Sequence, residues 1–177
     1  FDVSARTVAT QSLNIFGDHS DVYACRQTGF AMLCETNPQE VMDLSPVAHL
    51  ATIEGKVPFI NFFDGFRTSH EIQKIEKWDY ADLKEMCNMD AVAAFRAHAL
   101  NPEHPAMRGS HENGDVFFQH REACNTAYNE LPAIVEKYMA KINEKLGTNY
   151  DLFNYYGAED AERVIVAMGS INDVAEE

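Results

Sequence analysis

The run of residues from Val57 to Phe63 constrains the fold of this 177-residue chain more than any other feature. Its letters are V-P-F-I-N-F-F, so apolar side chains occupy both alternations of a strand rather than only one. A strand that is apolar on both sides is typical of a parallel sheet whose two faces are both covered. The run is also far too short to cross a lipid bilayer. We therefore predict an α/β fold, with a mainly parallel sheet and helices on both faces, in which this run is a central strand.

Strand and helix patterns alternate along the rest of the chain. Asn37-Pro38 is a typical helix start and Gly55 a typical helix end, which together frame a helix over Gln39 to Glu54. Pro46 removes one backbone donor inside this helix, so we expect a kink or a break near Leu44. The other predicted elements are the end of a strand at Phe1 to Val3, a helix at Arg6 to Phe16 with Ser4 as its N-cap, a short strand at Asp21 to Arg26, an apolar segment at Gly29 to Cys34, and helices at Ser69 to Ile75, Asp79 to Met86, Ala91 to Leu100 and Glu130 to Leu146.

Two segments suggest that further protein surrounds this chain. Asn101 to His120 is a long irregular stretch with two Pro and two Gly, and loops of this length are usually functional or clamp a neighbouring domain. Arg163 to Met168 has the pattern of a buried strand, and Ser170 is a plausible N-cap for a helix that begins at Ile171. A strand followed by the start of a helix opens an α/β unit. We therefore expect a fragment of a larger protein, with one domain over residues 1–159 and the next beginning at 160–177.

The charge and the cysteines exclude several classes of function. Fourteen Lys and Arg stand against 28 Asp and Glu, for a net charge of −14. Such a surface repels phosphate backbones and anionic lipids, which argues against nucleic-acid and membrane roles. No basic segment followed by an apolar run opens the chain, so we expect a cytoplasmic protein. The cysteines are Cys25, Cys34, Cys87 and Cys124. They form no C-x-x-C pair, and we expect them to be buried free thiols.

No self-sufficient catalytic motif is present, so candidate residues come from their positions. The loop from Asp64 to His70 directly follows the predicted central strand, at the end where parallel sheets usually bind ligands. His98, His104, His111 and His120 lie close in sequence, but their spacings do not place two of them on one helical face. We therefore expect no metal site, and a histidine-based metal hydrolase is disfavoured.

Two further positions could carry chemistry. Asp18, His19 and Asp21 share a polar loop and could bind a metal or relay protons. A turn network, in which the short carboxylates accept from local amides, is the preferred interpretation. Arg6 stands where a strand is predicted to turn into a helix, so its guanidinium could bind an anion with two parallel hydrogen bonds. From spacing alone, an ordinary surface arginine is the favoured interpretation.

A resemblance changes the weight of these candidates. The sequence blocks that carry the resemblance occur in the same order here as in a known family and cover essentially the whole chain. They include the motifs S-A-R, I-F-G-D-H-S-D-V and D-G-F-R-T-S-H-E. They span Ser4 to Leu33, Val57 to Ile75, Asn101 to Gly109, and Gly157 to Ser170. The chain resembles the pyruvate:ferredoxin (flavodoxin) oxidoreductase family. The resemblance implies the later part of the pyrimidine-side thiamine diphosphate-binding domain, incomplete at its N-terminus, followed at 160–177 by the start of a transketolase C-terminal-like domain.

The resemblance also implies an activity. The family oxidatively decarboxylates pyruvate with coenzyme A to acetyl-CoA, and passes the electrons to ferredoxin or flavodoxin. Its cofactors are thiamine diphosphate, Mg²⁺ and [4Fe-4S] clusters, and we expect a homodimer at full length. Arg6 lies in the S-A-R motif, whose arginine holds the substrate carboxylate in the family. Asp18 and His19 remain weaker catalytic candidates.

Much of the family's machinery falls outside this chain. The resemblance places the substrate-contacting threonine and the cofactor-activating glutamate before Phe1, and the diphosphate site and cluster cysteines far downstream. No residue of the chain is assigned to a cofactor or metal, and we expect neither to bind this piece alone. The alternative hypothesis is a non-catalytic α/β interaction or assembly module without a bound cofactor.

Overall fold

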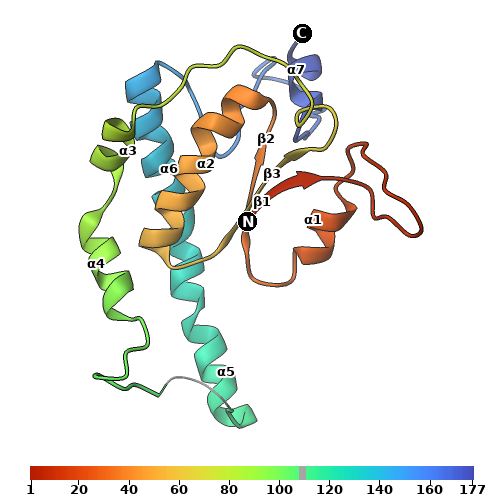
Figure 1. Cartoon of the computed structure of the whole chain (residues 1–177). Helices are drawn as coiled ribbons and strands as arrows, with labels where there is room; N and C mark the ends of the chain where they lie inside the picture. The colour runs from red at the N-terminus through yellow and green to blue at the C-terminus, as the bar shows by residue number, and fades with distance from the viewer. Residues whose placement is uncertain (108–110) are drawn as a thin grey trace.

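The computed structural model describes residues 1–107 and 111–177 of the chain. Figure 1 shows a small sheet at the centre, with the long helices gathered along one side of it. Arg108 and Gly109, from the third block of the resemblance, lie outside the described residues. The helices and strands are β1 (Asp2–Ala5), α1 (Ser20–Cys25), β2 (Ala31–Glu35), α2 (Pro38–Gly55), β3 (Phe59–Asp64), α3 (Tyr80–Met86), α4 (Met89–Ala97), α5 (Gly114–Ala123), α6 (Asn125–Leu146) and α7 (Ile171–Glu176).

The described strands form one parallel sheet in the order β1-β3-β2. β3 pairs with β1 in a register that places Asp2 opposite Asn61, and with β2 in a register that places Ala31 opposite Phe59. The first four residues of β3 are buried. The prediction that the apolar run is a central strand is therefore confirmed, although the strand begins at Phe59 and extends to Asp64.

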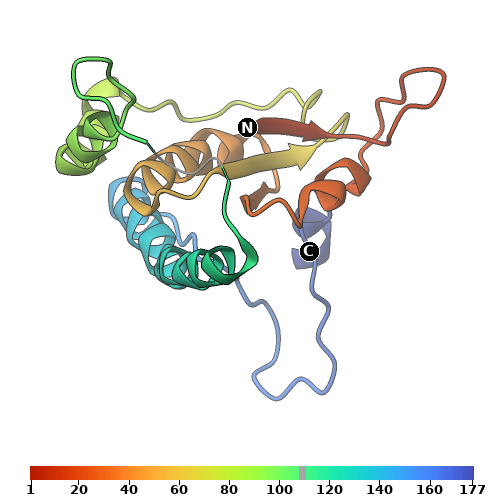
Figure 2. The same ribbon diagram turned by 90° about the horizontal axis from the view of Figure 1, so that it is seen from below.

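β3 sends alternate side chains into two hydrophobic cores. Phe59 packs in the larger core with α2 and α6, whereas Ile60 and Phe62 pack in a smaller core with Ala5 and with Val22 of α1. Figure 2 shows α2 on one side of the sheet and α1 on the other. The predicted fold class, a parallel sheet with helices on both faces, is confirmed.

The larger core depends on the contact between α2 and α6. The inward residues of α6 recur every three or four positions, which is the spacing of one helical face. They are Leu131, Val135, Tyr138, Met139 and Ile142. Val47 and Ala51 of α2 and Ile142 of α6 have no exposed surface. Since full burial of one such large side chain contributes about 1.5–3 kcal/mol, this contact is a main source of stability.

Helix α2 begins as the sequence predicts but continues through its proline. The Asn37 side chain accepts hydrogen bonds from the backbone N–H groups of Gln39 and Glu40, both at 3.1 Å. Of the kink or break expected near Leu44, the break is wrong, because α2 runs unbroken from Pro38 to Gly55 with Pro46 inside it, and the kink stays a prediction. Leu44 and its buried neighbours on α2 pack into the larger core. This packing offsets the one hydrogen bond that the proline removes.

Two predictions near the N-terminus are wrong. The segment from Arg6 to Phe16 is not a helix: Arg6 forms an isolated antiparallel bridge with Gly17, and the apolar side chains between them are mostly exposed. The expected strand at Asp21 to Arg26 is helix α1. Val22 and Cys25 are three residues apart, and as a helix they both face the smaller core.

Later predictions are partly confirmed. The helices expected at Asp79 to Met86, Ala91 to Leu100 and Glu130 to Leu146 correspond to α3, α4 and α6. The expected helix at Ser69 to Ile75 is wrong, since this segment forms turns and then irregular backbone. The expected irregular stretch at Asn101 to His120 contains most of α5.

Arg163 to Met168 forms no strand among the described residues, and its central side chains are exposed. The domain boundary near residue 159 stays a prediction.

The four cysteines differ in how far they are buried. Cys25, Cys34 and Cys87 are half-buried and Cys124 is exposed, so the expectation of four buried thiols is wrong. Burial raises the pKa of the Cys34 thiol to about 12.

Among the helices of the described part, none is both long enough and apolar enough to span a membrane.

Candidate active site

The predicted site residue Arg6 lies at the carboxyl end of β1, next to the end of β3. The backbone N–H of Gly65 donates to the carbonyl of Ala5 at 2.8 Å, which fastens the loop after β3 to the end of β1. The backbone N–H of Arg6 donates to a carboxylate oxygen of Asp21 at 3.1 Å. Arg6 is therefore held at the edge of a parallel sheet where ligands commonly bind.

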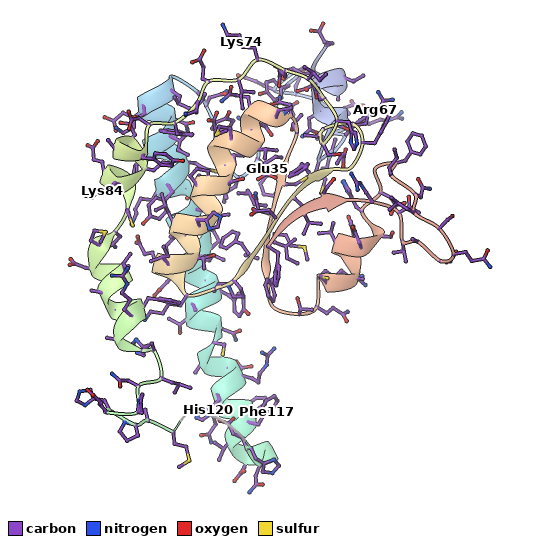
Figure 3. The ribbon with its side chains drawn as sticks, in the orientation of Figure 1. Glu35, Arg67, Lys74, Lys84, Phe117 and His120 are labelled. Atoms are coloured by element: carbon purple, nitrogen blue, oxygen red, sulfur yellow. The ribbon has the colours of Figure 1, made fainter. Side chains whose placement is uncertain are left out.

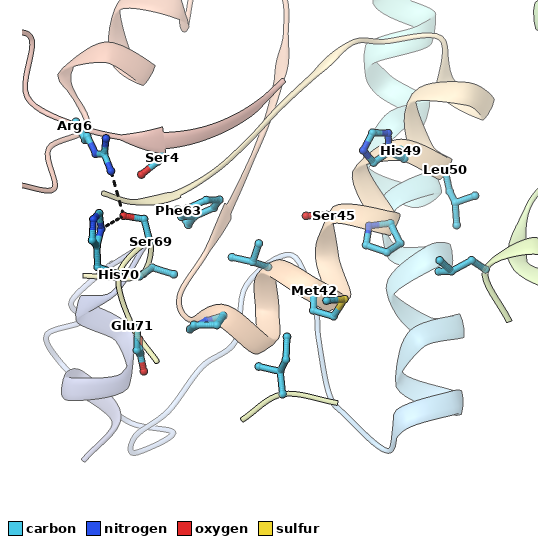
Figure 4. A pocket seen from close by; sticks show the side chains of 16 residues that line it. Ser4, Arg6, Met42, Ser45, His49, Leu50, Phe63, Ser69, His70 and Glu71 are labelled. Carbon is cyan, nitrogen blue, oxygen red and sulfur yellow. Dashed lines mark hydrogen bonds between the residues drawn. The ribbon is translucent and has the colours of Figure 1, made fainter. Parts of the chain in front are cut away.

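The Arg6 guanidinium is only partly satisfied by the protein. Nη2 donates to the Ser69 hydroxyl at 3.4 Å (Figure 4). Nε is buried and has no hydrogen-bond partner, and the hydroxyl oxygen of Ser4 on β1 is likewise buried without one. Unpaired buried donors are costly, so their presence points to a ligand that would satisfy them.

These groups line a cavity of about 860 Å³. Its polar end is formed by Ser4, Arg6, Ser69 and His70, and Figure 4 shows these residues together at the end of the sheet. Its apolar wall is formed mainly by α2 and the chain that follows the β3 loop. That wall includes Met42, Pro46, Leu50, Ile75 and Leu83. A guanidinium at one end of an apolar cavity suits a small organic anion.

The candidates Asp18 and His19 lie outside this cavity lining. Asp18 accepts the backbone N–H of Ser20 at 2.6 Å. Hydrogen bonding by the Ser20 side chain, and then by its backbone, lowers the pKa of the Asp18 carboxyl. His19 Nε2 lies 2.5 Å from Oδ1 of Asp64, the last residue of β3. Asp18 is therefore held in a local turn, whereas His19 pairs with a residue of the distant strand β3, and the catalytic roles of both stay predictions.

Asp64 joins His19 to the C-terminal segment. Its Oδ2 accepts the Ser170 hydroxyl at 2.6 Å and the Ser170 backbone N–H at 2.9 Å. Burial raises the pKa of the Asp64 carboxyl, but the hydrogen bonds from Ser170 and His19 outweigh burial and lower the pKa below 3.8. Ser170 therefore ties α7 to the sheet instead of capping its own helix, where its side chain makes no cap hydrogen bond.

Replacing Asp64 with Asn tests this junction. We expect Asp64→Asn to lower the free energy of unfolding of the chain by about 1 kcal/mol at neutral pH, because one acceptor becomes an amide donor. In the unmodified chain the lowered pKa makes the carboxylate stabilising above about pH 4, and this contribution is lost as the pH falls below that value. Urea unfolding from neutral to acidic pH should show a larger acid loss in the unmodified chain than in Asp64→Asn. The exposed Asp160→Asn is the control, and an equal acid loss in Asp64→Asn would contradict the prediction.

The four histidines that lie close in sequence, His98, His104, His111 and His120, do not line this cavity. His120 of α5, labelled in Figure 3, has Nδ1 2.5 Å from a carboxylate oxygen of Glu112, just before that helix. In residues 1–107 and 111–177, no three His, Cys, Asp or Glu side chains are placed so that they could hold one metal ion.

The structure adds residues that the sequence analysis did not single out. Ser69 and His70 belong to the loop predicted to follow the central strand, but the pairing of Ser69 with Arg6 depends on how that loop turns. Gly65 contributes by lacking a side chain, because a Cβ there would lie 2.3 Å from Cγ of Arg6. The sequence signals for these three residues are their place directly after the strand and their membership of the D-G-F-R-T-S-H-E motif.

A second polar cluster lies between the sheet and α2. The Asn61 amide donates to the Ser45 hydroxyl at 2.9 Å and to an Asp2 carboxylate oxygen at 3.2 Å, while its own oxygen accepts nothing. Glu35, at the end of β2, has no exposed surface and no hydrogen-bond partner for either carboxyl oxygen (Figure 3). Burial raises the pKa of Glu35 to about 9.

Comparison with known proteins decides which family carries this site. Residues 1–140 match the family model described as pyruvate flavodoxin/ferredoxin oxidoreductase, thiamine diphosphate-binding. The chain belongs to this oxidoreductase family. The expected resemblance is therefore confirmed.

Individual relatives agree with the family match over the whole chain. The chain is 61% identical over all 177 residues to a pyruvate-flavodoxin oxidoreductase of Enterobacter agglomerans, and 60% identical to one of Klebsiella pneumoniae. It is 56% identical over the same span to a pyruvate:ferredoxin oxidoreductase of Moorella thermoacetica. The chain covers 15% of the length of each of these oxidoreductases.

Proposed function

We propose that this chain is the part of a pyruvate:ferredoxin or pyruvate:flavodoxin oxidoreductase that binds the substrate carboxylate. In that reaction pyruvate and coenzyme A give acetyl-CoA and carbon dioxide, and two electrons pass to ferredoxin or flavodoxin. Family membership supports the proposal. The single observation that carries the role of this chain is the Arg6 guanidinium, buried at Nε without a partner, at the polar end of the cavity.

The residues of the cavity perform physical tasks that the reaction needs. Arg6 can bind a carboxylate with charge-assisted hydrogen bonds and so fix the orientation of the substrate. The apolar wall formed by Met42, Pro46 and Leu50 lowers the polarity of the same space. Ser4, whose hydroxyl is unpaired, is a further group that can contact a bound anion.

Thiamine diphosphate, when bound, supplies a nucleophilic carbon and accepts the electron pair released as carbon dioxide leaves. The cavity fits the substrate end of that chemistry, since its unpaired donors suit a carboxylate. The described residues offer no grouped metal ligands. We therefore assign the cofactor diphosphate, its Mg²⁺ and the [4Fe-4S] clusters to other parts of the longer polypeptide.

The remaining proposals concern the context of the chain. We assign residues 1–159 to the pyrimidine-side domain and residues 160–177 to the start of the next domain. Coenzyme A, ferredoxin or flavodoxin, and the rest of the same polypeptide are the proposed partners, in a cytoplasmic homodimer. A non-catalytic assembly module is the competing function, and it predicts no effect of the cavity residues on pyruvate use.

Substitution of Arg6 in the full-length oxidoreductase tests the proposal. Arg6→Ala should raise the pyruvate KM and lower kcat/KM about 10- to 100-fold, because a hydrogen bond to a charged group contributes about 1.5–3 kcal/mol. Arg6→Lys should recover only part of the loss, since an ammonium lacks the bidentate fork. Steady-state kinetics with varied pyruvate measures both.

The matched control is Arg26→Ala. Arg26 donates to the Tyr23 carbonyl at 3.0 Å on α1, and it does not line the cavity. The control removes the same charge and should leave the pyruvate KM unchanged. If Arg6→Ala behaved like the control, the carboxylate would not be bound by Arg6 and the proposal would fail.

A further inference from the structure

A chain of hydrogen bonds connects Arg6 to His70 through one hydroxyl group. The Ser69 oxygen accepts the Phe66 backbone N–H at 2.9 Å and Nη2 of Arg6 at 3.4 Å. The same hydroxyl lies 2.8 Å from Nδ1 of His70. Figure 4 shows Arg6, Ser69 and His70 in this line at the polar end of the cavity.

Along this line of hydrogen bonds, one arrangement uses both acceptor positions and the proton of the Ser69 hydroxyl. A serine hydroxyl has two acceptor positions and one proton to donate. Both acceptor positions of Ser69 are used by N–H groups, so its proton goes to Nδ1 of His70. His70 therefore accepts at Nδ1 and carries its own proton at Nε2. Without this acceptor, the Ser69 hydroxyl could rotate and turn its proton toward the guanidinium.

We propose that His70 is a positioning residue that orients the Ser69 hydroxyl so that its lone pair faces the Arg6 guanidinium, and thereby sets the guanidinium for the substrate carboxylate. This rests on the proposed function of Arg6. In this proposal His70 acts on the guanidinium through the Ser69 hydroxyl.

The loop after β3 holds His70 in the required place. The His70 ring lies against the Phe66 ring, with centroids 5.6 Å apart, and the Phe66 ring contacts Phe16 at 5.1 Å. The His70 backbone N–H donates to the Phe66 carbonyl at 3.1 Å, and the Ser69 N–H donates to the Asp64 carbonyl at 3.2 Å.

Phe66 itself adopts a left-handed backbone with φ of 61°. A side chain larger than glycine adopts this conformation only at a cost, and such strain is found most often at functional sites. The strained turn is what directs the Phe66 N–H at the Ser69 oxygen.

Two substitutions of His70 separate orientation from packing. His70→Phe keeps an aromatic ring beside Phe66 but removes the acceptor, whereas His70→Asn keeps an acceptor at the position of Nδ1 and removes the ring. In the full-length oxidoreductase, His70→Phe should raise the pyruvate KM about three- to tenfold with kcat changed less than about twofold. His70→Asn should restore the KM to within about twofold of the unmodified enzyme.

A double-mutant cycle identifies the route of the effect. Ser69→Ala should raise the KM as His70→Phe does, and adding His70→Phe to Ser69→Ala should have no further effect, because the link is already broken. If His70→Phe did not fold, as judged by circular dichroism, the cycle would be run with His70→Ala. His104→Phe, at an exposed histidine that does not line the cavity, is the control.

The outcomes distinguish this inference from the proposed function. An unchanged KM in His70→Phe, together with a raised KM in Arg6→Ala, would overturn the inference and leave the proposed function intact. A raised KM that His70→Asn does not restore would also overturn it, because the ring rather than the acceptor would then matter. An unchanged KM in Arg6→Ala would overturn both.

Discussion

Glu35→Gln is expected to raise the free energy of unfolding of the chain by about 3 kcal/mol at neutral pH. Glu35 is completely buried, and neither of its carboxyl oxygens has a hydrogen-bond partner. Burial disfavours the ionised form, so at neutral pH folding requires the carboxyl to take up a proton that it has released in the unfolded chain. A glutamine of the same shape carries no charge, and its amide can donate to the Asn61 oxygen, which accepts nothing in the structure.

The pH dependence of stability provides the sharper measurement. The pKa of Glu35 is raised from 4.5 in the ordinary state to about 9 in the folded chain. Between these values the folded chain holds a proton that the unfolded chain has released. The contribution of Glu35 is therefore most favourable below about pH 4.5, and it weakens by about 1.4 kcal/mol per pH unit as the pH rises toward 9.

Urea unfolding across this pH range should show that slope in the unmodified chain and a nearly flat profile in Glu35→Gln. The exposed Glu144→Gln on α6 serves as the control, because it removes a carboxylate without touching the buried cluster. Parallel profiles for the unmodified chain and Glu35→Gln would contradict the prediction.

Gly65→Ala is expected to disturb both the fold and the candidate site. An added Cβ would lie 2.3 Å from Cγ of Arg6 and 2.7 Å from the carbonyl oxygen of Ala5. That oxygen accepts the backbone N–H of Gly65 itself, so it cannot move away without breaking the junction between β1 and β3. We expect a loss of stability of about 1–3 kcal/mol from the clash. Displacement of Arg6 should add a loss in pyruvate kcat/KM as large as that of Arg6→Ala, about 10- to 100-fold.

Gly114→Ala is a matched control for this prediction. A Cβ at Gly114, the first residue of α5, would meet nothing within 4 Å. The same substitution should therefore leave stability and pyruvate kinetics nearly unchanged. Unfolding curves of the chain and steady-state kinetics of the full-length oxidoreductase measure the two effects, and normal values for Gly65→Ala would show that Arg6 does not need this space.

The sequence predicted the parts of the fold that are set by buried, local patterns. The apolar run of β3, the Asn37–Pro38 start of α2 and the apolar spacing of α6 each reflect interactions within one element and one core. The failures lie where such patterns are weak. Val22 and Cys25 fit a strand or a helix equally well in so short a segment, and only their packing against the smaller core decides for α1.

The candidate site was predictable in its position and not in its contacts. The place of Arg6 after one strand and of the Asp64 to His70 loop after another follows from the order of elements in a parallel sheet. That β1 and β3 are neighbours is a property of strand order, which the sequence does not display. The pairing of Ser69 with both Arg6 and His70 depends further on the left-handed turn at Phe66.

The strand order has a consequence for how this chain acquires its site. β2, α2 and β3 are consecutive from Ala31 to Asp64, whereas the β1 residue Asp2 is 59 positions away from the Asn61 that it contacts. Contacts between distant parts of a chain cost more closure entropy and form more slowly. We expect the consecutive unit to assemble first and β1 to dock on it last. Because Arg6 follows β1 directly, the guanidinium proposed to bind the carboxylate arrives with the last strand, and a chain caught before that step would have much of its core but no arginine at the polar end of the cavity.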